Sequence, residues 1–220
     1  MTPSSYHTHT TFCDGKDSPE ELVLEAIRLG CPEIGFSGHA HTAFDESWCM
    51  SVGGTKEYID CINSLKTKYA DKIKVLLGIE QDYFSDAPTE GYDYIIGSVH
   101  YVKKDGVYLP VDESHEIQLR IVKEHYMGDF YAFCEDYFAL VGDLYNKTKC
   151  DIVGHFDVIE KFNETGDLFD RSSPRYRAAA DTALDKLLQT GVKFEVNFGA
   201  VACGYRSEPY PDSRLLEQLR

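Results

Sequence analysis

The chain alternates between short apolar runs and longer segments in which apolar residues recur every three or four positions. The short runs predict β-strands, because runs of this length bounded by turn residues are typical of buried strands. They cover residues 4–8, 32–38, 73–79, 93–99, 151–154 and 192–198. Strands that alternate with helices in this way favour a parallel sheet with helices outside it.

Helix signals lie between the predicted strands. Ser18-Pro19-Glu20-Glu21 is a capping box with proline at the first helical position. Thr55 is expected to cap a second helix after a loop at 40–54, and Asp212 is expected to cap a last helix at 213–220. Further helices are expected over most of 115–148 and from Ser173-Pro174 to about Gly191, and residues 103–106 predict a hairpin turn.

The alternation continues along the whole chain without internal repeats, low-complexity stretches or linkers. The 220 residues are enough for one domain with a full core, so a single domain over 1–220 is expected. In barrels of parallel strands the active site lies at the carboxyl ends of the strands. Polar residues that follow the apolar runs are therefore the first candidates for chemistry.

Charge and composition narrow the possible partners. The formal net charge of −15 argues against a basic face for nucleic acid, while small anionic substrates stay possible because bound cations would dominate the local field. The seven cysteines form no C-x-x-C pair, which suits reduced thiols. Neither a signal peptide nor a membrane-spanning run is evident, so a cytoplasmic protein without a membrane partner is expected. The oligomeric state is left open.

Histidines follow several of the predicted strands. His7 and His9 are two positions apart, so one strand can direct both side chains to the same ion. The alternative for this pair is two surface histidines. Asp14 is either a turn residue of Asp-Gly or a ligand near that pair. We favour His39 as a ligand and His41 as a substrate contact, although His41 could also be a second ligand or a loop residue.

Three further residues follow apolar runs in the same manner. Glu80 comes after 74–79, and a carboxylate can bridge two ions through its two oxygens, whereas an imidazole nitrogen cannot. Its alternative role is to cap the next loop. His100 and His155 each have a glycine nearby, which lets the backbone approach closely. Imidazoles and carboxylates at one rim of a sheet predict a polynuclear metal site and a metal-dependent hydrolase.

These motifs resemble those of the PHP family (polymerase and histidinol phosphatase). The resemblance rests on H-T-H-T-x-x-x-D-G, S-G-H, G-I-E-x-D-Y, I-I-G-S-V-H and G-H-F-D, in this order along the chain. The stretch from Glu195-Val196-Asn197 to Pro211 is similar to the histidinol-phosphate phosphatase branch. The resemblance implies a distorted (β/α)7 barrel and the hydrolysis of L-histidinol phosphate in histidine biosynthesis.

The resemblance also implies two or three divalent ions, usually manganese, iron or zinc. By this resemblance His7, His9 and Glu80 hold one ion, Glu80, His100 and His155 hold a second, and Asp14 and His39 contribute to a third. The family normally closes with an Asp-x-His motif after a seventh strand, and no Asp-x-His occurs in the sequence. We therefore expect this chain to lack the last barrel strand and two ligands.

The expected reaction is metal-assisted hydrolysis of a small phosphomonoester, with Glu80, Asp157 and His41 as catalytic candidates. Arg206 and, more weakly, Lys161 are candidate phosphate contacts. Asp157 orients a ligand or donates the leaving-group proton, or else caps its loop. Asp82 meets the substrate amine or is a solvated loop residue. Two other functions stay open, namely a phosphodiesterase or exonuclease-like hydrolase and a catalytically impaired metal-binding protein.

Overall fold

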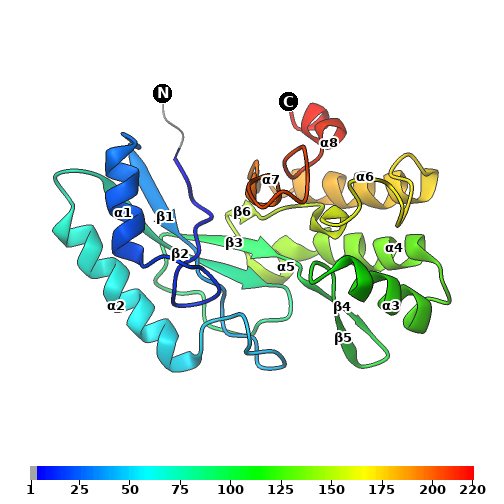
Figure 1. The fold of residues 1–220 in the computed structure, drawn as a ribbon, viewed down its shortest axis with the longest axis horizontal. Coiled ribbons are helices and arrows are strands. Elements are labelled where there is room, and N and C mark those ends of the chain that lie inside the picture. The colour runs from blue at the N-terminus through cyan, green and yellow to red at the C-terminus, as the bar shows by residue number, and fades with distance from the viewer. Residues whose placement is uncertain (1–3) are drawn as a thin grey trace. The chain divides into compact units, whose positions relative to one another are not determined.

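The computed structural model describes residues 4–220, which divide into two compact units, one ending at Ile96 and the other covering Gly97–Arg220. Each unit contains parallel strands and helices, so the fold is α/β with parallel strand pairing, as predicted (Figure 1). The single domain and the closed barrel both stay predictions. No helix within residues 4–220 is long and apolar enough to cross a membrane.

The first unit is built on β1 (Glu33–Phe36), β2 (Lys74–Asp82) and the beginning of β3 (Tyr94–Ser98), with α1 (Pro19–Arg28) and α2 (Val52–Lys68) packed against it (Figure 1). β1 and β2 run parallel, with Ile34 opposite Val75 and Phe36 opposite Leu77. Side chains from both helices and both strands form one apolar core, which includes Val23, Phe36, Tyr58, Ile62, Leu77 and Ile79.

Capping residues explain where the two helices begin. Ser18 and Glu21 form the predicted capping box of α1. The second helix begins earlier than predicted, because Ser51 rather than Thr55 is its N-cap and accepts a hydrogen bond from Gly54 N at 3.0 Å. The predicted first strand at 4–8 is reduced to a single parallel bridge between Ser5 and Ile34.

Two glycines in neighbouring strands make room for one tyrosine. A Cβ at Gly78 would lie 2.2 Å from Cζ of Tyr94, and a Cβ at Gly35 would lie 2.4 Å from its hydroxyl oxygen. That hydroxyl donates a hydrogen bond to Phe36 O at 3.1 Å. Gly35 of β1 and Gly78 of β2 therefore leave the space in which the Tyr94 ring packs across the sheet.

The second unit combines a short parallel pair with several helices. β6 (Ile152–Val153) and β7 (Lys193–Phe194) pair in parallel, and both are shorter than predicted. β4 (Tyr101–Lys104) and β5 (Val107–Pro110) form the predicted hairpin, with positive φ at Asp105 and Gly106. The remaining elements are α3 (His115–His125), α4 (Phe130–Val141), α5 (Leu144–Thr148), a 3₁₀ turn (Val158–Glu160), α6 (Pro174–Leu188), α7 (Gly199–Ala202) and α8 (Ser213–Gln218).

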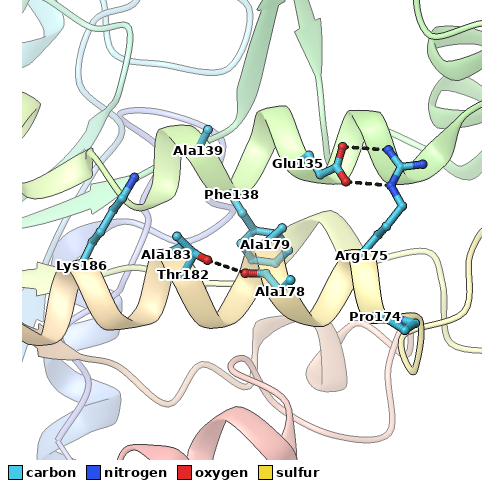
Figure 2. Close-up of a pocket in the computed structure, with 10 residues that line it drawn as sticks. All are labelled: Glu135, Phe138, Ala139, Pro174, Arg175, Ala178, Ala179, Thr182, Ala183 and Lys186. Carbon is cyan, nitrogen blue, oxygen red and sulfur yellow. Dashed lines mark hydrogen bonds and ion pairs between the residues drawn. The ribbon is translucent and has the colours of Figure 1, made fainter.

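Helices α4 and α6 lie side by side and provide much of the core of this unit. Figure 2 shows the shallow groove between them, where small side chains of α6 such as Ala179 and Ala183 face α4. Arg175 closes one end by donating two hydrogen bonds of 2.8 Å to the carboxylate of Glu135. Beneath the groove, the ring of Phe138 packs edge-on against Tyr176, 5.4 Å between centroids.

Candidate metal centre

Glu80 is the centre of the candidate site in the first unit, and its side chain is fully buried. It lies within β2, which continues to Asp82, so the prediction that the strand ends before it was wrong. The strand continues because Glu80 N donates to Gly38 O and Ala40 N donates to Glu80 O, at 3.2 and 2.9 Å. This parallel bridge places His39 directly beside Glu80 at the carboxyl end of β1.

Three imidazoles surround one carboxylate oxygen of Glu80. The distances to Oε2 are 3.0 Å from His7 Nε2, 3.3 Å from His9 Nε2 and 2.9 Å from His39 Nδ1. Ligand atoms of His9, His39 and Glu80 all lie within 4.8 Å of one another. The structure thus brings together residues that are far apart in the sequence. Their imidazole nitrogens and the carboxylate of Glu80 form one set of potential metal donors.

Asp14 joins this cluster from the loop after His9. Its Oδ1 lies 3.4 Å from His9 Nδ1 and 3.6 Å from His39 Nε2. The loop is tight, since Gly15 N donates to Thr10 O at 3.1 Å and a Cβ at Gly15 would lie 2.4 Å from Thr10 N. The same loop therefore forms the Asp-Gly turn and places Asp14, a potential ligand, beside His9 and His39.

The charges of the cluster show that it suits a cation. Although burial opposes protonation of His9, hydrogen bonds to Cys13 and Glu80 raise the pKa of its imidazole to about 9. Burial also opposes ionisation of Asp14, yet the hydrogen bond and charge of His39 lower the pKa of its carboxyl. Positive charge is favoured among these groups, and a divalent ion can take the place of the proton. Imidazole and carboxylate donors fit zinc, iron and manganese.

His100 and His155 are the candidate ligands of the second unit. Both are buried, and their rings lie 5.0 Å apart in an edge-to-face arrangement. The backbone N–H of His155 donates to Glu195 Oε1 at 2.7 Å, which ties the end of β6 to the chain after β7. The two predicted histidines are thus neighbours within their unit.

Asp157 follows His155 in a fully buried acidic group. Its Oδ2 accepts a hydrogen bond from Asp212 N at 2.8 Å, while its Oδ1 has no hydrogen-bond partner among residues 4–220. Carboxylate oxygens of Asp157, Glu160 and Asp212 lie within 4.8 Å of one another. Burial and the nearby charge of Glu160 raise the pKa of Asp157 well above its usual range.

The two candidate phosphate contacts are already paired with carboxylates. Arg206 donates from Nη1 to Glu160 Oε2 at 2.7 Å, and its Nη2 lies 3.4 Å from Glu208 Oε1. Lys161 donates from Nζ to the backbone oxygen and to Oδ2 of Asp112, at 2.9 and 3.1 Å. Their proposed roles require that a substrate compete with these partners.

Two other predicted residues lie in the first unit. His41 Nε2 is 2.7 Å from Glu46 Oε1, and the backbone oxygen of His41 accepts a hydrogen bond from Ser85 Oγ at 2.7 Å. Asp82 is a buried residue at the end of β2, so its alternative as a solvated loop residue was wrong. Its Oδ1 accepts a hydrogen bond from Phe84 N at 2.8 Å, which shapes the turn that follows.

Several residues around the candidate ligands were not predicted. Cys13 Sγ lies 3.5 Å from His9 Nδ1, and its position next to Asp14 was a usable signal. The ring of Tyr210 lies 6.4 Å from that of His155, edge to face. Asp112, which pairs with Lys161, and Glu195, which holds the backbone of His155, carry no local sequence signal for these roles.

Comparison with known proteins shows which proteins this chain is similar to. The chain is 27% identical to a Schizosaccharomyces pombe protein named probable histidinol-phosphatase, over 99% of this chain and 76% of that protein. A Listeria monocytogenes structure assigned as a histidinol phosphatase has a TM-score of 0.83 at 21% identity and covers 98% of this chain and 90% of that one. A Lactococcus lactis histidinol phosphate phosphatase, solved with zinc, L-histidinol and phosphate, has a TM-score of 0.61 at 23% identity, with 88% and 72% covered.

The two solved structures share the fold of this chain. Beyond fold, residues 5–198 match the PHP domain, and this segment includes every candidate metal ligand named above. The chain therefore belongs to the PHP domain family.

Proposed function

We propose that this chain is a metal-dependent phosphomonoesterase that hydrolyses L-histidinol phosphate to L-histidinol and phosphate. The observation that carries this proposal is the convergence of His7, His9 and His39 on one oxygen of the buried Glu80. A carboxylate so surrounded by imidazoles is a poor place for an apolar or anionic group and a good place for a cation. The name of the Schizosaccharomyces pombe relative supports the choice of substrate.

We propose ligands for each ion from the nitrogen and oxygen donors that lie close together. His7, His9 and Glu80 would hold one ion, and Asp14 with His39 would contribute to another, since each set lies together in the first unit. His100 and His155 are proposed ligands from the second unit. The proposed ions are manganese, iron or zinc, two or three in number. When bound, such ions supply Lewis-acid chemistry, which makes water more acidic and offsets charge on phosphoryl oxygens.

The protein's own groups have distinct proposed tasks. Glu80 is proposed to keep the three imidazoles in place. Asp157 is a proposed proton donor to the leaving group, because burial raises its pKa and favours the protonated acid. Lys161 and Arg206 are proposed phosphate contacts, and His41 and Asp82 are proposed contacts to the rest of the substrate.

The test combines a substrate assay with metal analysis. The full chain is stripped with EDTA, reloaded with manganese or zinc, and assayed for phosphate release from L-histidinol phosphate and from a phosphodiester. We expect activity on the monoester that depends on the added ion. Glu80→Gln should reduce turnover by about 100-fold or more and lower the bound metal, because the carboxylate charge is lost while the shape is kept.

Glu57→Gln is the matched control, since Glu57 is an exposed residue of α2 and undergoes the same chemical change. It should keep full activity and metal content. Unchanged turnover in Glu80→Gln, or a preference for the phosphodiester, would refute the proposed function. Bound metal without hydrolysis of either substrate would favour a catalytically impaired metal-binding protein.

A further inference from the structure

His9 presents its two ring nitrogens to two different surroundings. Its Nε2 faces Glu80 Oε2 at 3.3 Å, on the side where the three imidazoles converge. Its Nδ1 faces away from that oxygen, 3.5 Å from Cys13 Sγ and 3.4 Å from Asp14 Oδ1. A neutral imidazole carries only one N–H, so these two surroundings decide which nitrogen keeps it.

Cys13 lies where its sulfur can accept a hydrogen bond from Nδ1–H of His9. It lies in the tight turn after His9, where Cys13 N donates to Thr10 O at 3.0 Å. Its side chain is half-buried. When His9 Nδ1 is the protonated nitrogen, this sulfur is an acceptor 3.5 Å away from it.

The opposite tautomer would be unfavourable in this place. An unprotonated Nδ1 would turn its lone pair toward the carboxylate of Asp14, which can only accept, and could receive only the weak S–H of Cys13. Its Nε2–H would then point at Glu80 and could not bind an ion. Histidines that ligate metals usually donate their second ring N–H to a fixed acceptor, which orients the ring.

We propose that Cys13 is a positioning residue, whose sulfur accepts the Nδ1–H of His9 and so presents Nε2 as a metal donor beside Glu80. The inference rests on the metal site of the proposed function. The sulfur itself is not a ligand in this proposal, because it faces Nδ1 of His9 rather than the Nε2 that lies beside Glu80. Loss of such an outer partner typically weakens metal affinity by about 10–100-fold.

The experiment measures zinc affinity of the full-length, metal-free chain by competition with a chromophoric chelator. Cys13→Ala should weaken the affinity for one of the bound zinc ions by about 10–100-fold. Cys13→Ser should keep most of the affinity, because its hydroxyl can still accept from Nδ1–H. Cys31→Ala is the control, since Cys31 is a half-buried cysteine of the same unit just after α1, and it should bind zinc like the unchanged chain.

Two spectra test the role directly. In the zinc-loaded protein, nitrogen NMR of the imidazole rings should find His9 protonated at Nδ1. In the cobalt-loaded protein, no thiolate-to-cobalt charge-transfer band should depend on Cys13. Such a band, present in the unchanged chain and lost in Cys13→Ser, would make Cys13 a ligand and overturn the proposal.

Unchanged zinc affinity in Cys13→Ala would equally overturn it. If that variant fails to fold, Cys13→Ser and the cobalt spectrum still decide the question. None of these measurements needs turnover. If zinc affinity depends on Cys13 as expected but the chain does not hydrolyse the substrate, this inference stands and the proposed function is refuted. If the chain hydrolyses the substrate but its zinc affinity does not depend on Cys13, the proposed function stands and this inference is refuted.

Discussion

Arg206 is almost completely buried, with 1% of its side chain exposed, and its partners determine what it does. Its guanidinium lies against Glu160, which is itself fully buried and also receives a hydrogen bond from Tyr176. Arg171 contributes a second, longer contact to Glu160 at 3.2 Å. Arg206 therefore stabilises a buried carboxylate in addition to any role as a phosphate contact.

Replacing Arg206 with alanine should destabilise the protein. Removing one partner of a buried ion pair leaves the other charge without compensation, which typically costs about 3–5 kcal/mol. Urea unfolding of Arg206→Ala should show this loss, whereas Arg177→Ala, at an exposed position of α6, should stay within about 0.5 kcal/mol. If Arg206→Ala unfolds like the unchanged chain and only raises KM, the phosphate contact is its main role.

Single residues also show which parts of the site the sequence could predict. His39 and Glu80 were predicted because each follows an apolar run, and His7 and His9 because they stand two positions apart, and both features are local properties of the sequence. Cys13 and Asp112 were missed because their roles depend on partners brought close by folding. The pairing of Arg206 with Glu160 spans 46 positions of sequence, so spacing alone gave no indication of it.

At the scale of elements, Asp93 joins three segments of the first unit just before β3. Its Oδ2 accepts a hydrogen bond from Leu77 N in β2 at 2.7 Å, and it pairs with Lys66 of α2. Its own N–H donates to Leu77 O at 2.7 Å. One carboxylate thus links α2, β2 and the entry to β3.

The stability contributed by Asp93 should depend on pH. Although burial opposes ionisation, Lys66 and the backbone N–H of Leu77 lower the pKa of Asp93 in the folded chain. Its contribution is therefore present above the unfolded pKa of about 4 and is lost as the pH falls through the folded pKa. Asp93→Asn should cost about 1 kcal/mol at pH 7, because the pair is partly exposed, and clearly less near pH 3.

This prediction is checked by denaturant unfolding of both chains in EDTA at several pH values. An equal difference at pH 7 and pH 3 would contradict it, since the loss would then come from packing rather than charge. Asp71→Asn is a suitable control, because Asp71 is an exposed acid just before β2, and it should show little difference at either pH.

Element boundaries were predicted well where a local signal fixes them. Ser18 begins α1 and Asp212 begins α8 as expected, since both side chains accept hydrogen bonds from their own helices. Thr55 was wrongly preferred to Ser51, because both residues can cap a helix and only the tertiary context decides. The end of β2 was missed because its last residues are polar, although they are buried and paired through the bridge between His39 and Glu80.

At the scale of the whole molecule, the net charge of −15 means that carboxylates repel one another across the chain. Divalent ions that bind only the folded chain would relieve part of this repulsion and stabilise it by mass action. At a free zinc concentration of 100 times Kd, one site should contribute about 2.7 kcal/mol. Removal of metal with EDTA should therefore lower the melting temperature, and zinc should restore it.

The same measurement tests the single domain predicted from chain length. If residues 1–220 unfold cooperatively, zinc should move one calorimetric transition as a whole, even though Glu80 and its three imidazoles all lie in the unit that ends at Ile96. Glu80→Gln should reduce this shift, whereas Glu57→Gln should keep it. Two transitions, of which zinc moves only one, would contradict the single domain and show that the two units unfold separately.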